Sequence, residues 1–287
     1  MSRPRAALVS GASTGIGAAT AQRLTAAGWA VWAGVRDDAA VERLGSLEGV
    51  RPVYLDVTDQ DSVLTAMAEV RACRGDDGLD LLVNNAGIVR GGPLEFLDMA
   101  EWEHQFDVNF FGTVRLTRAA LPLLRRAVDP RIILVGSIAG RIAGPLVGPY
   151  AASKHALAGL AGSLRRELGR GGPHVTLLEP GAVVTPLWGK AAMTAAQIDA
   201  QLPADGRALY GGLVDRQRRL LGDGDHRGIE ADRVARVIES CADRRYPPAR
   251  RLVGLDARIG GLAARFLPES VLDAVLSRGG SPSDSAS

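Results

Sequence analysis

The sequence predicts a doubly wound α/β fold, in which helices cover both faces of a parallel sheet. Short runs that are apolar throughout alternate with segments of helical periodicity along most of the 287 residues. Continuously apolar strands are typical of a parallel sheet that is buried on both sides, and their alternation with helices is the pattern of βαβ units. No Gly-, Pro- or Ser-rich linker divides the chain, so we expect one domain over residues 1–278.

The elements of this fold can be placed from the apolar runs and the helical spacing between them. The expected strands are Ala6–Val9, Ala30–Val35, Val50–Val57, Leu79–Val83, Arg131–Val135 and Val175–Leu178. The expected helices are Gly15–Ala27, Ala39–Leu47, Asp59–Cys73, Ala100–Arg126 and Ala151–Leu168.

After the last expected strand the alternation lapses. Residues 186–228 are polar and contain several glycines, which predicts a long irregular excursion that serves as a substrate lid; a surface insertion without a role is the alternative. Apolar stripes broken at Pro268 predict a C-terminal helical extension. We expect these stripes to cover the body or a subunit interface rather than a membrane surface. Residues 279–287 are expected to form a disordered tail.

Charge and composition argue against several classes of function. The chain has 34 basic and 32 acidic residues, a balance that predicts no nucleic-acid binding. Its two cysteines and four histidines show no metal-ligand spacing, so we expect reduced thiols and no metal. No stretch approaches the ~18 apolar residues of a membrane span, and the first apolar run is too short for a signal peptide. We therefore expect a cytoplasmic protein.

The segment between the first expected strand and helix is rich in glycine. It reads Ser10-Gly11-Ala12-Ser13-Thr14-Gly15-Ile16-Gly17. Glycines let the backbone approach a pyrophosphate, and the N-terminus of the helix offers unpaired N–H groups to an anion. The spacing is Gly-x-x-x-Gly-x-Gly rather than the Gly-x-Gly-x-x-Gly of many dinucleotide-binding folds, and a tight turn without a ligand is the alternative.

Tyr150 and Lys154 are four residues apart on one expected helix, so their side chains point to the same side. A tyrosine has an ordinary pKa of ~10, and a nearby ammonium would bring that pKa toward neutrality. In isolation the pair could equally be an exposed helical pair. Its place shortly after Ser137 favours an active site, because Ser137 follows a strand and ligands bind at the carboxyl ends of such strands.

Seven motifs follow one another along the chain: the glycine-rich segment, Asp56-Val57, Asn84-Asn85-Ala86-Gly87, Asn109, Ser137, Tyr150-x-x-x-Lys154, and Pro180-Gly181 with Thr185. In this order they resemble the motifs of the short-chain dehydrogenase/reductase family, and the C-terminal part 250–268 looks like the extension of members that act on steroids and retinoids. The resemblance covers residues 6 to about 186 and implies a Rossmann-type oxidoreductase. Ser137 would then bond the substrate carbonyl oxygen, Tyr150 would act as general acid/base, and Lys154 would also bond the nicotinamide ribose. Asn109 would hold a water that connects Lys154 to solvent. A turn-forming Ser137 and an Asn109 without function are the alternatives.

The resemblance also implies the residues that hold the cofactor. Asp56 would contact the adenine, Val57 would donate its backbone N–H, and residues 180–185 would hold the nicotinamide carboxamide. A helix-capping Asp56, amides at 84–85 that stabilise the central strands and a plain Pro-Gly turn remain alternatives. The expected cofactor-binding set is Gly11, Ser13, Thr14, Gly15, Ile16, Gly17, Arg36, Asp56, Val57, Asn84, Ala86, Gly87, Tyr150, Lys154, Pro180, Gly181, Val183 and Thr185.

The end of the second expected strand predicts NADP(H) rather than NAD. An acidic residue there would bond the ribose 2′-hydroxyl of NAD, whereas an arginine accommodates the 2′-phosphate of NADP. The family's acidic position falls on Val35, and Arg36 follows it with a guanidinium that suits a phosphate. NAD is the alternative, because Asp37 and Asp38 could reach the ribose in a shifted turn and Thr14 stands where some NADP-preferring relatives place a basic residue.

The expected reaction is hydride transfer between NADP(H) and a hydrophobic ketone or secondary alcohol. Apolar residues before Tyr150 and in the excursion favour such a substrate, although they could simply pack the lid onto the body. Those in the excursion are Leu187, Trp188, Met193, Ile198, Leu202 and Leu209. An NAD-dependent alcohol dehydrogenase and a non-catalytic cofactor-binding sensor are the alternatives. Because the family usually dimerises through the helices at 100–126 and 151–168, we expect a homo-oligomer.

Overall fold

The predicted parallel sheet is confirmed. The structure is a computed structural model and describes residues 3–45, 48–187, 189, 200, 202–222 and 228–277. Within these residues, seven strands form one sheet in the order β3-β2-β1-β4-β5-β6-β9, and every neighbouring pair is parallel. The tail 279–287 and the excursion residues Trp188, Met193 and Ile198 lie outside the described residues.

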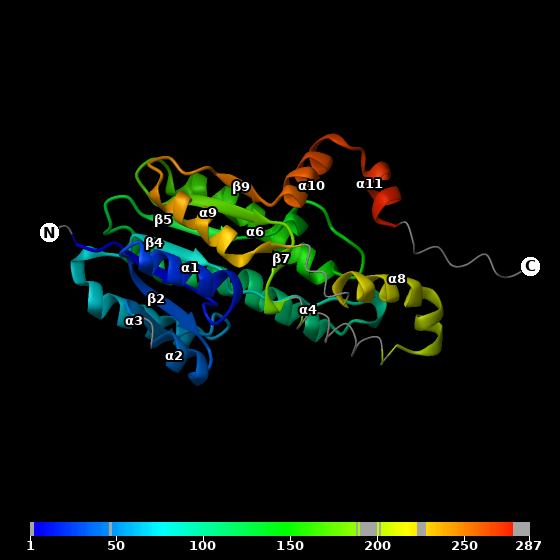
Figure 1. The fold of residues 1–287 in the computed structure, drawn as a ribbon, viewed down its shortest axis with the longest axis horizontal. Coiled ribbons are helices and arrows are strands. Elements are labelled where there is room, and N and C mark those ends of the chain that lie inside the picture. The colour runs from blue at the N-terminus through cyan, green and yellow to red at the C-terminus, as the bar shows by residue number, and fades with distance from the viewer. Residues whose placement is uncertain are drawn as a thin grey trace, which may run out of the picture.

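The strands and helices follow the alternation read from the sequence (Figure 1). The strands of the sheet are β1 Ala6–Val9, β2 Ala30–Val35, β3 Val50–Tyr54, β4 Leu81–Asn84, β5 Arg131–Val135, β6 His174–Pro180 and β9 Arg250–Val253. The helices are α1 Gly15–Ala26, α2 Asp38–Gly45, α3 Gln60–Arg74, α4 Met99–Phe106, α5 Gly112–Leu124, α6 Gly148–Leu168, α8 Ala204–Gly222, α9 Ala231–Asp243, α10 Leu255–Phe266 and α11 Glu269–Leu276. Short elements complete the described chain: the pair β7 Val183–Val184 and β8 Ile229–Glu230, the 3₁₀ turns η1 Gly75–Asp77, η2 Leu94–Phe96 and η4 Ile138–Gly140, and the π-helical turn η3 Asp107–Phe111.

Both faces of the sheet are buried, which explains why the strands are apolar at consecutive positions. Leu8 of β1 belongs to a core cluster with residues of α3, α5 and α6. Its neighbour Val9 belongs to a second cluster, on the other face, with residues of α1 and α9. Because successive side chains of a strand point to opposite faces, each face requires its own apolar set. The strand order reverses between β1 and β4, and such a switch point opens a crevice at the carboxyl ends of the strands.

Four parts of the fold differ from the sequence prediction. The edge strand β9 and helix α9 were not predicted as elements of the body, and β9 escaped notice because its first two residues are exposed arginines. The excursion 186–228, expected to be irregular, contains the helix α8. Its apolar residues are sparse and interrupted by glycines, so helical periodicity is weak there. The expected helix over Ala100–Arg126 is two helices joined by η3.

The C-terminal extension is helical, as predicted, and forms α10 and α11. The inner face of α10 is buried at Ala257 and Gly261, whereas Leu262 and Phe266 are 59% and 69% exposed. These apolar stripes therefore do not cover the body of the single chain, and their role at a subunit interface stays a prediction. Figure 1 shows α8, α10 and α11 at the end of the molecule far from the N-terminus. Among the described residues, no helix is long and apolar enough to cross a membrane.

Candidate active site

The glycine-rich segment forms a tight cradle between β1 and α1. Thr14 is the N-cap residue of α1 in an extended conformation, and its side chain makes no capping hydrogen bond. A Cβ atom on Gly17 would lie 2.2 Å from the carbonyl oxygen of Gly11, so only glycine lets the helix begin this close to the loop. The first N–H groups of α1 are thereby left at the crevice, where they suit an anion.

Ser10 and Asn85 tie this loop to the end of β4. The Ser10 hydroxyl oxygen accepts hydrogen bonds from the backbone N–H of Asn85 at 3.0 Å and of Ala86 at 3.1 Å. The Asn85 amide donates to the carbonyl oxygens of Ser10 and Gly11, both at 3.0 Å. Asn85 was missed as a site residue in favour of Asn84, whose amide is buried and donates to the Thr117 hydroxyl at 3.0 Å. Asn84 thus bonds to α5 rather than lining the crevice.

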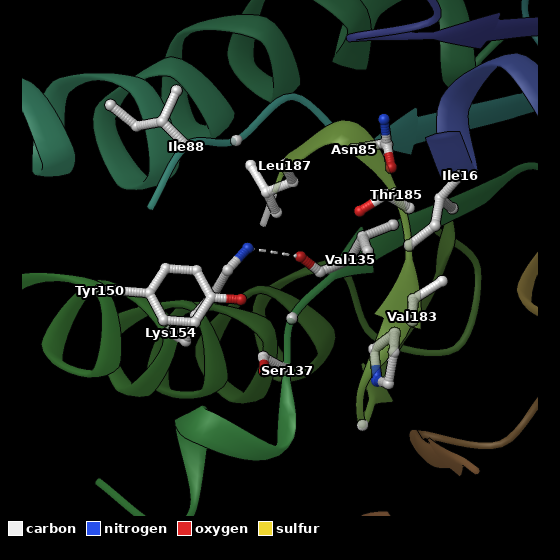
Figure 2. A pocket seen from close by; sticks show the side chains of 14 residues that line it. Ile16, Asn85, Ile88, Val135, Ser137, Tyr150, Lys154, Val183, Thr185 and Leu187 are labelled. Carbon is white, nitrogen blue, oxygen red and sulfur yellow. Dashed lines mark hydrogen bonds between the residues drawn. The ribbon is translucent and has the colours of Figure 1, made fainter. Parts of the chain in front are cut away.

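Ser137, Tyr150 and Lys154 meet beside this crevice (Figure 2). Ser137 follows β5 and begins η4, and its hydroxyl oxygen accepts the backbone N–H of Ala139 at 3.1 Å. The side chains of Ser137 and Tyr150 share a hydrogen bond. The Lys154 ammonium donates to the Val135 carbonyl oxygen at 2.9 Å and lies 5.7 Å from the centre of the Tyr150 ring. The structure therefore brings the three predicted residues together.

Burial governs the titration of this cluster. It raises the pKa of Tyr150 above the usual 10, and the hydrogen bond with Ser137 opposes that rise. Burial also lowers the pKa of Lys154 from 10.5 to about 8. The sequence-based expectation that the ammonium would lower the pKa of Tyr150 is thus not met, because burial raises that pKa and the hydrogen bond with Ser137 is what opposes the rise. Tyr150 holds its proton at neutral pH and is suited to donate it.

Asn109 lies inside η3 and joins two parts of the site. Its amide oxygen accepts the backbone N–H of Ile88 at 2.9 Å. Its amide nitrogen donates to the Ile88 carbonyl oxygen and to the Ser153 hydroxyl oxygen, both at 3.1 Å. Ser153 in turn donates to the Tyr150 carbonyl oxygen at 2.7 Å. The Asn109 side chain is committed to protein groups, and its predicted role in holding a water stays a prediction.

Gln105 is a second amide that the sequence reasoning missed. It lies four residues before Asn109, is fully buried, and accepts the backbone N–H of Arg90 at 2.7 Å. Its amide nitrogen donates to the carbonyl oxygen of Ile88 at 2.9 Å. Residues four apart share one side of a helix, so two amides hold the backbone of residues 88–90 against α4 and η3. The four-residue spacing of the two amides was the available signal.

We expect Asn109→Leu to lower the free energy of unfolding by about 2–3 kcal/mol, because the Ile88 N–H loses its partner in a buried site. Urea unfolding of the purified variant measures this change. Ser153→Ala is the matched control: it removes the bond from Asn109 and the bond to the Tyr150 carbonyl oxygen but leaves the Ile88 N–H paired, and should lower the free energy by only about 1–2 kcal/mol. An Asn109→Leu variant as stable as the wild type would contradict the assigned contacts.

Most of the predicted cofactor residues line two adjoining cavities, the larger of about 330 Å³. The predicted residues that line them are Gly11, Ser13, Thr14, Gly15, Ile16, Arg36, Val57, Ala86, Gly87, Ser137, Tyr150, Lys154, Pro180, Gly181, Val183 and Thr185. Gly17, Asp56, Asn84 and Asn109 are not among the lining residues. Gly17 and Asn109 lie beneath the cavity wall. Gly17 lets α1 approach the glycine-rich loop, and Asn109 bonds Ile88 and Ser153.

The charged residues at the end of β2 are arranged around Arg36. The Asp37 carboxylate accepts the backbone N–H of Ala40 at 2.8 Å and so caps α2. Asp56 accepts the backbone N–H and the hydroxyl of Thr58 at 2.9 and 2.7 Å. Arg36 is half-exposed, and its guanidinium lies 3.8 Å from the second Asp56 oxygen. The guanidinium is therefore the charged group from the end of β2 that lines the cavity.

A glycine cradle at the switch point of a parallel sheet, beside a buried Ser–Tyr–Lys cluster, defines a Rossmann-type oxidoreductase. Residues 5–195 match the family model described as short chain dehydrogenase. The chain belongs to the short-chain dehydrogenase family and is an enzyme of that oxidoreductase class.

Three similar proteins span nearly the whole chain. The NADPH-dependent 3-dehydrocapnine reductase of Ornithobacterium rhinotracheale is 31% identical over 94% of this chain and 95% of that protein. Retinol dehydrogenase 16 of Mus musculus is 31% identical over 93% of this chain and 86% of that protein. A short-chain dehydrogenase/reductase of Burkholderia phymatum, solved in complex with NAD, has a TM-score of 0.76 and 26% identity, covering 99% and 98% of the two chains.

Proposed function

We propose that the protein transfers hydride between NADP(H) and a hydrophobic ketone or secondary alcohol, with Tyr150 as the general acid/base. The observation that carries this proposal is the buried cluster of Ser137, Tyr150 and Lys154 next to the glycine cradle. Family membership supports the reaction class. The cofactor and the substrate class are our own inference from the residues around that cluster.

The residues present fit a nicotinamide dinucleotide. The approach of α1 to the loop at Gly17 leaves N–H groups for the pyrophosphate, and Arg36 would hold a 2′-phosphate. Pro180, Gly181, Val183 and Thr185 line the cavity next to Ser137 and would hold the nicotinamide end. When bound, the cofactor supplies or accepts the hydride.

The chain's own residues donate the proton and stabilise the charge that develops on the carbonyl oxygen. Ser137 and Tyr150 share a hydrogen bond, so their hydroxyls lie close together. Both hydroxyls can exchange this bond for bonds to one substrate carbonyl oxygen and so polarise the carbonyl. Tyr150 keeps its proton at neutral pH and donates it as that oxygen gains charge. Lys154 has a pKa of about 8 and is still mostly protonated at pH 7, so it can return a proton to Tyr150. Alcohol oxidation runs through the same groups in reverse.

NADP(H) is favoured by the charges at the end of β2. Of the two carboxylates that could have opposed a 2′-phosphate, Asp37 caps α2 and Asp38 is the first residue of that helix. Neither is among the residues that line the cavity, whereas Arg36 is. The NADPH-dependent relative supports this preference, whereas the solved relative in complex with NAD supports the alternative. A direct test of the arginine distinguishes the two.

We expect Arg36→Ala to weaken NADPH binding on the order of 30- to 100-fold and NADH binding less than about threefold, because only NADPH carries the phosphate. Fluorescence titration of the purified protein measures both dissociation constants. Arg36→Lys is the matched control: it keeps the charge but loses the bidentate geometry, and should give an intermediate loss for NADPH. Equal losses for the two cofactors would exclude this role of Arg36.

A hydrophobic substrate is favoured by the surroundings of Tyr150. Val89 is buried with it, and Ala139, Val147 and Leu187 pack against the pair. These side chains come from three separate segments, so the apolar lining is a property of the pocket and not of one element. The likeness to a retinol dehydrogenase points the same way.

The proposed function is tested by a panel of steroids, retinoids and aryl ketones, assayed in both directions with both cofactors. Sugars and charged hydroxy acids serve as the polar comparison set. We expect turnover with NADPH and apolar carbonyls, and kcat/KM values at least about tenfold lower for the polar set. Tight NADPH binding without turnover on any member would favour the cofactor-binding sensor.

A further inference from the structure

A buried carboxylate with two arginine partners lies between the end of η4 and the end of β6. Glu179 of β6 is 1% exposed, and its carboxylate accepts hydrogen bonds from two arginines. Arg141 bonds both carboxylate oxygens, at 2.9 and 2.7 Å, and Arg250 of β9 also bonds both. Burial alone would raise the pKa of Glu179, but the hydrogen bonds from the two arginines outweigh it, so that the carboxyl stays ionised.

The two ends of the Arg141–Glu179 pair belong to different parts of the active site. Arg141 directly follows η4, the turn that Ser137 begins. Glu179 directly precedes Pro180 and Gly181, which line the cavity beside Ser137. A bidentate arginine–carboxylate bond fixes both distance and orientation. The pair therefore sets the spacing between the substrate-binding serine and the segment proposed to hold the nicotinamide.

The same turn is held on its other side by α6. A Cβ atom on Gly140 would lie 2.7 Å from the carbonyl oxygen of Lys154, so η4 packs directly on the backbone of the helix that carries Tyr150 and Lys154. The turn η4 is thus fixed between α6 and β6. Next to the turn, the backbone N–H of Gly136 donates to the Leu178 carbonyl oxygen of β6 at 2.7 Å. Arg141 adds the side-chain link between the far end of the turn and β6.

We propose that Arg141 and Glu179 are positioning residues, which hold the Ser137 turn against the Pro180–Gly181 segment so that the carbonyl and the hydride donor meet in reactive geometry. The inference rests on the proposed function for its catalytic consequence. Neither side chain contacts the reacting atoms; both act through the segments to which they belong. Misplacing reacting groups by about 1 Å can lower a rate on the order of 100-fold.

Arg250 provides a matched control within the same cluster. It bonds the same two oxygens as Arg141, but it comes from the edge strand β9, opposite Leu177 of β6. Each arginine variant leaves Glu179 with one guanidinium, so both should reduce stability to a similar extent. Only Arg141 connects Glu179 to the Ser137 turn, so only its loss should disturb the spacing.

The experiment compares Arg141→Met, Arg250→Met and Arg141→Lys in the full chain. For Arg141→Met we expect kcat to fall on the order of 100-fold while KM for NADPH changes less than about threefold. Arg250→Met should keep kcat within about threefold at a similar loss of melting temperature. Arg141→Lys should restore part of the rate, because it returns the charge without the bidentate fork. The emission spectrum of bound NADPH gives a second readout, and it should change in Arg141→Met but not in Arg250→Met.

The outcomes separate this inference from the proposed function. Equal losses of kcat in the two methionine variants, or an unchanged rate and unchanged bound-NADPH emission in Arg141→Met, would overturn the positioning role. A wild type that binds NADPH but turns over no carbonyl would instead refute the proposed function. In that case the emission of bound NADPH still tests whether Arg141, and not Arg250, governs how the nicotinamide end is held.

Discussion

Tyr150→Phe is expected to lower kcat on the order of 1,000-fold while leaving NADPH binding within about threefold of the wild type. The phenol donates the proton in the proposed reaction, and phenylalanine keeps the ring packed against Val89 and Leu187 but has no proton to give. Ser137 can still bond the carbonyl oxygen, so some activity from polarisation and positioning should survive. Steady-state kinetics on a substrate from the carbonyl panel, together with a fluorescence titration of NADPH, measures both effects.

The control for this substitution is Tyr246→Phe. Tyr246 is 74% exposed and lies in the segment before β9, so its hydroxyl has no part in the site. The control should keep wild-type kinetics. Turnover by Tyr150→Phe at the wild-type rate would refute the proposed proton donor, and a large loss of NADPH affinity would show that Tyr150 acts mainly in binding.

The sheet was predictable because each strand has to be apolar on both faces. The runs Ala6–Val9, Ala30–Val35 and Arg131–Val135 agree with the observed strands to the residue, since both core clusters draw on consecutive positions. The strand β9 was missed for the opposite reason. It lies at the edge of the sheet, and two of its four residues are exposed arginines. Its sequence therefore lacks the continuous apolar run that marks the central strands.

The positions of the two adjacent asparagines could have been predicted from strand alternation. Leu82 and Asn84 point to the same face of β4, and Leu82 packs in the cluster that includes residues of α5. Asn84 therefore faces Thr117 of α5, and Asn85, beyond the end of the strand, is the residue left at the crevice. The motif alone did not distinguish the two amides.

Other parts of the site depend on tertiary contacts that have no local signal. Arg141 and Glu179 are 38 residues apart, and each would ordinarily be taken for a solvated surface charge. The π-helical turn at Asn109 likewise gave no sign in the apolar periodicity of the flanking helices. Such turns are frequent at functional sites, and here the turn carries the amide that joins Ile88 to Ser153.

Lys154→Met is expected to lower turnover on the order of 100- to 1,000-fold and yet to raise the melting temperature. Burial lowers the pKa of Lys154 from 10.5 to about 8, which corresponds to about 3 kcal/mol of destabilisation when the buried ammonium is charged. Methionine removes that charge, although the Val135 carbonyl loses its hydrogen bond, at a cost of about 1 kcal/mol. A net gain of about 1–2 kcal/mol would raise the melting temperature by about 3–6 °C.

The pH dependence gives this prediction its sign. Between pH 8 and 10.5 the unfolded chain holds the Lys154 proton more tightly than the folded chain, so wild-type stability from this group rises with pH. The variant lacks this dependence, so its advantage should be full below about pH 8 and shrink as the pH rises. It should be lost before pH 10.5, where the missing bond to the Val135 carbonyl leaves the variant slightly less stable. Melting curves of both proteins across this range measure the difference. Two outcomes would show that the charged ammonium of Lys154 does not destabilise the fold. One is a variant that is less stable than the wild type at pH 7, and the other is a variant that is more stable by the same amount at every pH. A gain in stability joined to a loss of turnover would show that this buried charge is kept for the reaction and not for the fold.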